Sequence, residues 1–151
     1  MSAPTPVAET TASERGDTSS ISRPRPEITP VTKHYWDALA AGELHYQACQ
    51  ACGHTWLPAR EQCPRCLGTA WNWQLASGGA RLISWVVYHT PYHAYFAERL
   101  PYTVGVVELD EGPRLIAGID DPPTDLAIDR RLTLTVRHES DVHFPSFSLA
   151  S

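Results

Sequence analysis

The second half of the chain, from residue 78 onward, alternates between hydrophobic and polar positions, which is the period of a β-strand with one buried face. The alternating runs are rich in Val, Ile, Leu, Thr and aromatic residues, and these residue types favour strands. The turn sequence Asp110-Glu111-Gly112 joins two of these runs as a hairpin. The pattern predicts strands at residues 81–89, 102–109, 113–119, 131–139 and 143–149.

A succession of short strands with a longer connection after the first is typical of a small closed barrel, because closure leaves no strand edge exposed. The spacing favours a five-stranded OB-fold barrel. A five-stranded SH3-like barrel has a similar pattern, and periodicity alone does not separate the two architectures.

The first half of the chain has a different composition and period. Residues 1–30 are rich in Pro, Ser, Thr and Glu and show no hydrophobic period, so we predict a disordered tail. Residues 32–42 follow Pro30 with a helical pattern, in which Thr32 is the expected N-cap and Gly42 ends the segment. One face of this predicted helix carries Tyr35, Trp36, Leu39 and Ala40.

Two short strands are predicted on either side of the four cysteines. Residues 43–47 alternate and lead into the first cysteine, so we expect Gln47 on the face opposite Leu44 and Tyr46. Residues 71–75 alternate in the same way after the last cysteine.

The sequence Ser77-Gly78-Gly79 marks a break after the second of these strands. We therefore predict a tail at residues 1–30, a helix with a cysteine-rich module at residues 31–77 and a barrel at residues 78–151. The predicted fold class is mainly β, with an N-terminal helix, a rubredoxin-like four-cysteine zinc ribbon and a five-stranded OB-fold barrel.

The four cysteines form two C-x2-C pairs separated by ten residues. This spacing lets the thiolates of both pairs face one point, as in the tetrahedral four-thiolate shell of a zinc ribbon. Glycine at Gly53, and Leu67-Gly68 after the second pair, are expected to form the tight turns because glycine reaches positive φ at no steric cost. The predicted zinc ligands are Cys49, Cys52, Cys63 and Cys66.

Zinc at this site is expected to be structural, since four cysteines leave no open position for water. A module of this size cannot bury enough surface to fold alone, so the metal supplies the missing stability. Two alternatives are iron, as in a rubredoxin-like electron carrier, and a ligand role for His54, which follows the first pair.

Composition narrows the classes of partner. The formal net charge of −5 disfavours binding to phosphate backbones by bulk electrostatics. No hydrophobic run is long enough to cross a membrane and no secretory signal is recognisable, so the sequence predicts a cytoplasmic protein with reduced thiols.

Candidate catalytic groups are few. His89, Tyr92 and His93 lie on the long connection after the first barrel strand, where a histidine could act as an acid or base. The pair Asp120-Asp121 at the end of a strand could also act in this way but fits a solvated turn. No nucleophile with an adjacent base is recognisable, and we assign no catalytic residue.

Taken together, these motifs resemble the acyl-CoA-associated zinc-ribbon and OB-fold family known as domain of unknown function 35. The resemblance spans residues 32–149 and follows a fixed order of helix, strand, two knuckles and barrel. It departs from the family at Ala80 and Asp129, where glycine is common, and neither position is a zinc ligand. The matching pieces are Tyr35-Trp36-Asp37-Ala38-Leu39, Leu44-His45-Tyr46-Gln47, Leu82-Ile83-Ser84-Trp85 and Val107-Glu108-Leu109-Asp110-Glu111-Gly112.

The resemblance implies an OB-type barrel and a non-catalytic accessory subunit. Such a subunit binds and stabilises an enzyme of the thiolase superfamily, namely a thiolase, aldolase or acyltransferase, and helps to form its acyl-CoA site. If acyl-CoA or the partner contacts this chain, the expected residues are His89, Tyr92, Tyr95, Phe96 and Trp36. The phosphates of CoA would need Arg81 or Arg99.

Two other functions stay open on the sequence alone. A single-stranded nucleic-acid-binding module is one, because Trp71, Trp73 and Trp85 could stack on bases. A free-standing acyl-CoA-acting enzyme with a histidine base is the other. The acyl chain, the partner, its reaction and the stoichiometry are not specified by the sequence.

Overall fold

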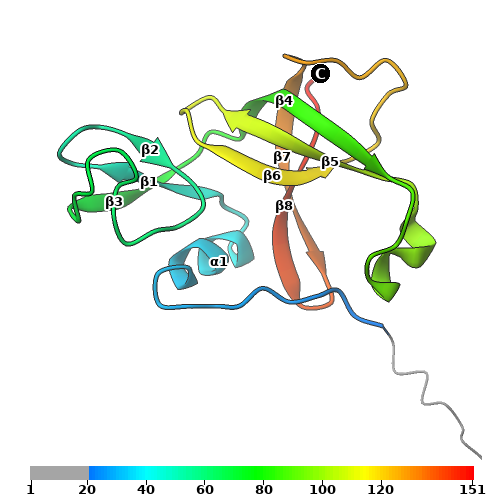
Figure 1. Ribbon diagram of the computed structural model, residues 1–151, viewed down its shortest axis with the longest axis horizontal. Coiled ribbons are helices and arrows are strands. Elements are labelled where there is room, and N and C mark those ends of the chain that lie inside the picture. The colour runs from blue at the N-terminus through cyan, green and yellow to red at the C-terminus, as the bar shows by residue number, and fades with distance from the viewer. Residues whose placement is uncertain (1–20) are drawn as a thin grey trace, which may run out of the picture.

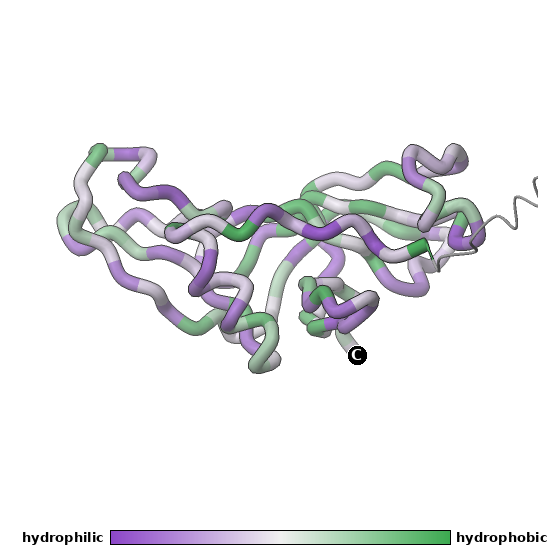
Figure 2. Tube along the Cα trace, turned by 90° about the horizontal axis from the view of Figure 1, so that it is seen from below, coloured by the Kyte–Doolittle hydropathy of each residue, from purple (hydrophilic) through white to green (hydrophobic). Residues whose placement is uncertain are grey.

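The computed structural model describes residues 21–151. It places a small ribbon and a barrel side by side along the long axis, with a helix beneath the junction between them (Figures 1 and 2). The predicted residues 1–20 of the tail lie outside the described part. The elements, in order, are α1 (Lys33–Ala40), β1 (His45–Cys49), β2 (Thr55–Trp56), β3 (Trp71–Leu75), β4 (Gly79–Tyr88), the 3-10 helix η1 (Ala94–Arg99), β5 (Tyr102–Leu109), β6 (Arg114–Ile119), β7 (Arg131–Glu139) and β8 (Val142–Leu149).

Helix α1 forms where the apolar stripe predicts it and buries Ala38 and Leu39. Thr32 is the residue before the helix, but its side chain makes no capping bond. Its hydroxyl oxygen instead accepts a hydrogen bond from the backbone N–H of Thr29 at 2.8 Å. The helix ends before Gly42, whose φ of +85° is one that glycine adopts without strain.

The ribbon is a sheet in which β1 lies between β2 and β3, with both neighbours antiparallel. Strand β2 was not predicted, since two residues carry no readable period. Gln47 lies outside the hydrophobic cluster that holds Leu44 and Tyr46, as expected for the opposite face of the strand, yet it is completely buried. Its amide hydrogen bonds to backbone groups of a covering loop, so this face of β1 is closed by chain rather than by solvent.

Within residues 21–151, the barrel is closed in the order β4-β5-β6-β8-β7, and β7 pairs back with β4. The five predicted strands are all present, and the turn at residues 110–112 joins β5 and β6 as predicted. Strands β6 and β8 pair in parallel, whereas the other neighbours pair antiparallel. This closed five-stranded barrel confirms the predicted OB-type fold.

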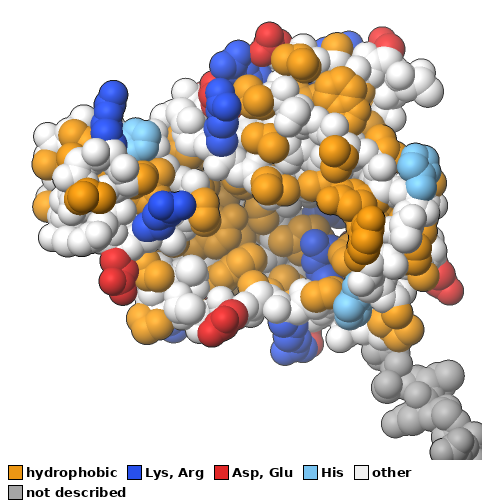
Figure 3. Space-filling model, in the orientation of Figure 1, with side chains coloured by type: hydrophobic (Ala, Val, Ile, Leu, Met, Phe, Trp, Pro, Cys, Tyr) orange, Lys and Arg blue, Asp and Glu red, His pale blue; other side chains and the backbone are white. Residues whose placement is uncertain are grey.

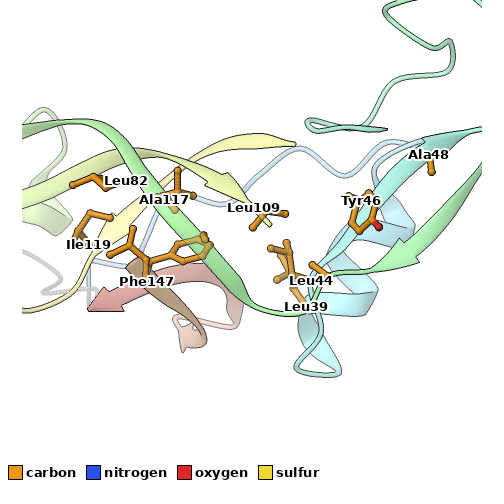
Figure 4. Close-up of a cluster of buried hydrophobic side chains, with 13 residues drawn as sticks. Leu39, Leu44, Tyr46, Ala48, Leu82, Leu109, Ala117, Ile119 and Phe147 are labelled. Carbon is orange, nitrogen blue, oxygen red and sulfur yellow. The ribbon is translucent and has the colours of Figure 1, made fainter. Parts of the chain in front are cut away.

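One hydrophobic core runs through ribbon and barrel without a gap (Figure 4). Tyr46 of β1, Leu44 just before that strand and Leu39 of α1 pack in the same cluster as barrel residues, among them Leu82 and Phe147. The ribbon and barrel are therefore expected to stabilise each other. The division of the chain at residues 77 and 78 stays a prediction.

Candidate functional site

The four cysteine sulfur atoms lie within 4.8 Å of one another. The distance between the Sγ atoms of Cys49 and Cys66 is 3.6 Å, and that between Cys52 and Cys63 is 3.7 Å. A tetrahedral ion with Zn–S bonds of about 2.3 Å separates its sulfur ligands by about 3.8 Å. The sulfur cluster thus fits one zinc ion and is far too open for disulfides.

The two knuckles that carry the cysteines repeat one backbone pattern. The N–H of Cys49 donates to the carbonyl of His54, and the N–H of Cys63 donates to that of Gly68. In each knuckle the residue four positions after the first cysteine has positive φ, +75° at Gly53 and +63° at Leu67. The expectation that Gly68 takes this role is wrong, because a leucine holds the left-handed position.

Gly68 is needed for space instead. A Cβ atom at residue 68 would lie 3.2 Å from Sγ of Cys66 and 3.9 Å from Sγ of Cys49. A side chain there would therefore crowd the sulfur of Cys66, which is one of the ligands. The close approach of residue 68 to the Cys66 sulfur depends on the folded structure, so the spacing of the cysteines in the sequence does not reveal it.

The backbone around the first ligand favours its metal-binding form. The backbone N–H of Cys52 points at the Cys49 sulfur and lowers the pKa of that thiol to about 6, which favours the thiolate that binds metal. When bound, zinc supplies a cross-link between the knuckles. His54 is not among the clustered ligands of residues 21–151, and its ring instead stacks on Trp56 with ring centres 6.2 Å apart.

The loop between the knuckles is fixed by two side chains that the sequence analysis did not single out for this purpose. The buried amide of Gln47 accepts from the backbone N–H of Arg60 and donates to its carbonyl, each at 2.8 Å. The indole N–H of Trp71 donates to the carbonyl of Glu61, also at 2.8 Å. The second knuckle is thereby positioned against the first.

A second feature is a groove of about 1260 Å³ at one end of the barrel. Tyr92 and Phe96, both predicted surface residues, lie in its lining. Tyr95 is buried, and the guanidinium of Arg99 lies 3.9 Å from the centre of its ring. The Tyr95 hydroxyl donates a hydrogen bond to Glu139. His89 is exposed and does not line the groove.

Trp36 lies elsewhere, in an apolar groove of about 560 Å³ between α1, the ribbon loop and strands β5 and β6. Figure 3 shows this face hollowed between ribbon and barrel, with hydrophobic side chains in the hollow. Ile116 lines the same groove and is 74% exposed, although it lies on a regular barrel strand. Of the predicted surface residues, Tyr92 and Phe96 therefore line one groove and Trp36 lines another, whereas His89 and Tyr95 line neither.

Two of the candidate acid and base groups have structural partners. Nδ1 of His93 accepts a hydrogen bond from the backbone N–H of Tyr95 at 3.1 Å and so caps η1. Asp120 accepts from Arg137 at 2.6 Å. These contacts explain the positions of His93 and Asp120 without assigning either a catalytic role.

Comparison with known proteins matches the two halves of this architecture. Residues 36–72 match a family model described as the rubredoxin-like zinc ribbon domain of ChsH2, and residues 73–137 match its C-terminal OB-fold domain. A solved structure described as the Ltp2-ChsH2(DUF35) aldolase is 29% identical, with a TM-score of 0.75, and covers 84% of this chain and 100% of that chain. A DUF35-family protein of unknown function from Sulfolobus solfataricus, 13% identical with a TM-score of 0.61, shares the fold over 82% of this chain and 87% of its own.

Curated relatives carry related names. A probable enoyl-CoA hydratase alpha subunit from Thermomonospora curvata is 35% identical over 64% of this chain, but the match spans only 30% of that protein. A DUF35 domain-containing scaffold protein from Methanocaldococcus jannaschii is 31% identical over 59% of this chain and 64% of its own length. The chain thus spans less than two thirds of these relatives.

The cysteine cluster and the matched ribbon together identify a structural zinc site, as predicted. No helix within residues 21–151 is both long and apolar enough to cross a membrane. The consecutive matches to ribbon and barrel, in the order and geometry that the structure shows, place this chain in the DUF35 family of ChsH2-type zinc-ribbon and OB-fold proteins.

Proposed function

We propose that this protein is a non-catalytic accessory subunit of a thiolase-superfamily enzyme that acts on acyl-CoA, and that it works in the cytoplasm. The relatives support this proposal, since one is named as a probable subunit of an enoyl-CoA hydratase, another as a scaffold protein, and one solved relative is described as part of an aldolase. Free thiols gathered for metal binding suit a reducing compartment.

The observation that carries the proposal is the apolar groove around Trp36. The face of β5 and β6 that borders it points out of the barrel, yet it presents Val106 and Ile116, which pair across the two strands. Outward positions on a small barrel are normally polar, and an apolar patch joined to a hollow is typical of a protein-binding surface. The enzyme partner is the occupant we assign to it.

The nucleic-acid alternative is less well supported by the geometry. Trp71 packs edge-on against Trp56 and Trp73, and Trp73 stacks on His34 with ring centres 4.7 Å apart. Trp85 packs against the common core. These rings are engaged within the protein and do not form a row of open faces for bases.

The test is co-purification of the tagged chain from its native host, with mass spectrometry of the recovered proteins. An enzyme of the thiolase superfamily should be recovered in fixed ratio, and Ile116→Asp should lower its recovery at least tenfold because a charge in the groove must be desolvated. Ile128→Asp is the control, since Ile128 is also well exposed, at 61%, but does not line this groove. Recovery of the chain alone, or equal loss with both variants, would count against the proposal.

A further inference from the structure

Strand β6 has an open edge beside the apolar groove that holds Trp36. On one side, β6 pairs with β5 along its whole length. On the other side, only Gly118 and Ile119 pair, with Ser146 and Phe147 of β8. Within residues 21–151, the first part of β6, residues 114–117, therefore has a strand neighbour on one side only.

The backbone of Ile116 points to this open edge. Along an antiparallel ladder, residues alternate between those that exchange hydrogen bonds with the neighbouring strand and those that direct these groups away from it. The N–H of Leu109 donates to the carbonyl of Pro113 at 2.8 Å, which sets the phase of the alternation. Counting on from this bond, Leu115 bonds to β5, and Ile116 directs its N–H and C=O groups away from β5.

A proline in β8 explains why the pairing of β6 with β8 stops before Ile116. Where the parallel ladder is formed, the N–H of Asp120 donates to the carbonyl of Phe147 at 2.7 Å, so the backbone of Phe147 points to β6. Two residues earlier in β8, the position that points the same way is Pro145, and proline has no N–H to donate. Strand β8 thus has no donor in register with the carbonyl of Ile116.

The open edge forms one wall of the apolar groove. Val106 and Ile116 line it on the barrel side, Trp36 lines it on α1, and Leu57 lines it on the ribbon loop. In Figure 1, α1 lies below β6 and the ribbon lies beside it. A groove that joins unpaired backbone groups to apolar walls fits an extended chain, because its backbone can pair with the edge while alternate side chains contact the walls.

The walls of the groove limit which chain can enter. A second copy of this protein would bring its own β6 flanked by its own α1 and ribbon loop, so two such walled edges cannot meet. The chain's own segment before α1 leads away from the groove, from Thr32 in the lining to Arg23, whose N–H donates to Ser140 in the β7–β8 turn at 3.1 Å. An exposed, extended segment of another protein meets neither obstacle.

We propose that the enzyme partner adds an extended segment as a strand to the open edge of β6 and places apolar side chains against Trp36 and Leu57. The inference rests on the proposed function for the identity of the partner and goes beyond it in naming the mode of docking. In this mode, backbone pairing with the N–H and C=O groups of Ile116 supplies affinity, and the alternate side chains of the added strand supply specificity.

The first test compares Ile116→Pro with Ile116→Ala in co-purification from the native host. Both variants shorten the apolar side chain, but only proline removes the N–H at the edge. This N–H makes no bond to β5, so both barrels should fold, which thermal unfolding by circular dichroism checks. Ile116→Pro should recover about tenfold less enzyme than Ile116→Ala, the loss expected when a backbone hydrogen bond is removed and its partner stays unpaired. Equal, measurable recovery would overturn strand addition.

Amide hydrogen exchange gives a second readout that needs no variant. It is measured on the zinc-loaded full chain alone and in its purified complex with the recovered enzyme. The N–H of Ile116 should exchange at least about tenfold more slowly in the complex, because an amide in a strand ladder exchanges only when the ladder opens. Ile128 is the control, since it is also well exposed, at 61%, and does not line the groove; its exchange should not change.

The outcomes separate the two proposals. Unchanged exchange at Ile116 in the complex would overturn strand addition alone, since the recovered enzyme would still support the accessory function. Protection of Ile116 in the chain alone would also overturn it, with a dimeric mass pointing to a second copy and a monomeric mass to the chain's own residues. Failure to recover any enzyme would defeat the accessory function and the added strand together.

Discussion

At the residue scale, the zinc site depends on contacts that are not ligands. Gln47 is the clearest case, because its buried amide is hydrogen-bonded at both ends to Arg60. A buried polar group is costly unless it is paired, and here the pairing also fixes the loop that carries the second knuckle. A strand pattern alone makes Gln47 look like a solvent-facing residue, because alternation does not reveal a loop that folds back over the strand.

Gln47→Met tests this contact, since methionine has a similar shape and lacks both hydrogen-bonding groups. We expect a loss of about 2–4 kcal/mol in the free energy of unfolding, because two backbone groups of Arg60 lose their partners. The measurement is urea unfolding of the zinc-loaded protein, with tryptophan fluorescence as the probe. Gln50→Met is the control, because Gln50 is exposed. Equal stability of the two variants would contradict the role assigned to Gln47.

At the element scale, the ribbon is small and is expected to depend on the metal for its order, yet it is not isolated from the barrel. Strand β1 contributes Tyr46, and the residue before it contributes Leu44, to the core that the barrel shares. The backbone N–H of Ser77 donates to Glu111 at 2.7 Å, and the Thr55 hydroxyl donates to the Glu111 carbonyl at 3.0 Å. The ribbon is therefore attached to the β5–β6 turn as well as to α1.

Removal of zinc should consequently affect both halves. Structural zinc contributes about 10–16 kcal/mol in small ribbon-like modules, so Cys52→Ser should unfold β1 to β3 and lower the thermal midpoint of the barrel. Far-UV circular dichroism with zinc analysis of the same sample measures both effects. Gln50→Ser, an exposed change between the first two ligands, should keep one zinc and the native midpoint. A Cys52→Ser protein with unchanged melting would show that the ribbon does not depend on metal.

Most elements could be predicted because their signals are local. Alternation indicated the barrel strands, and the spacing of the cysteines indicated the zinc ligands. Strand β2 was missed because its two residues are too few to show a period. The two grooves could not be predicted, since each is lined by side chains from segments that are far apart in the sequence and meet only in the folded chain.

At the scale of the whole molecule, the protein presents two separate surfaces on one shared core. The apolar groove at Trp36 is the surface to which the proposed enzyme partner is assigned, and a second groove opens at the barrel end beside Tyr92 and Phe96. Candidate catalytic groups such as His93 and Asp120 are engaged in structural contacts. This arrangement supports the proposed accessory role, in which the partner enzyme would carry out bond cleavage.

The most direct measurement is acyl-CoA turnover by three samples: the purified chain, the purified partner enzyme and their reconstituted complex. The account predicts no turnover by the zinc-loaded chain alone and faster or longer-lasting turnover by the complex than by the partner alone. Turnover by the isolated chain, abolished by substitution of both His89 and His93, would contradict it and identify a free-standing enzyme.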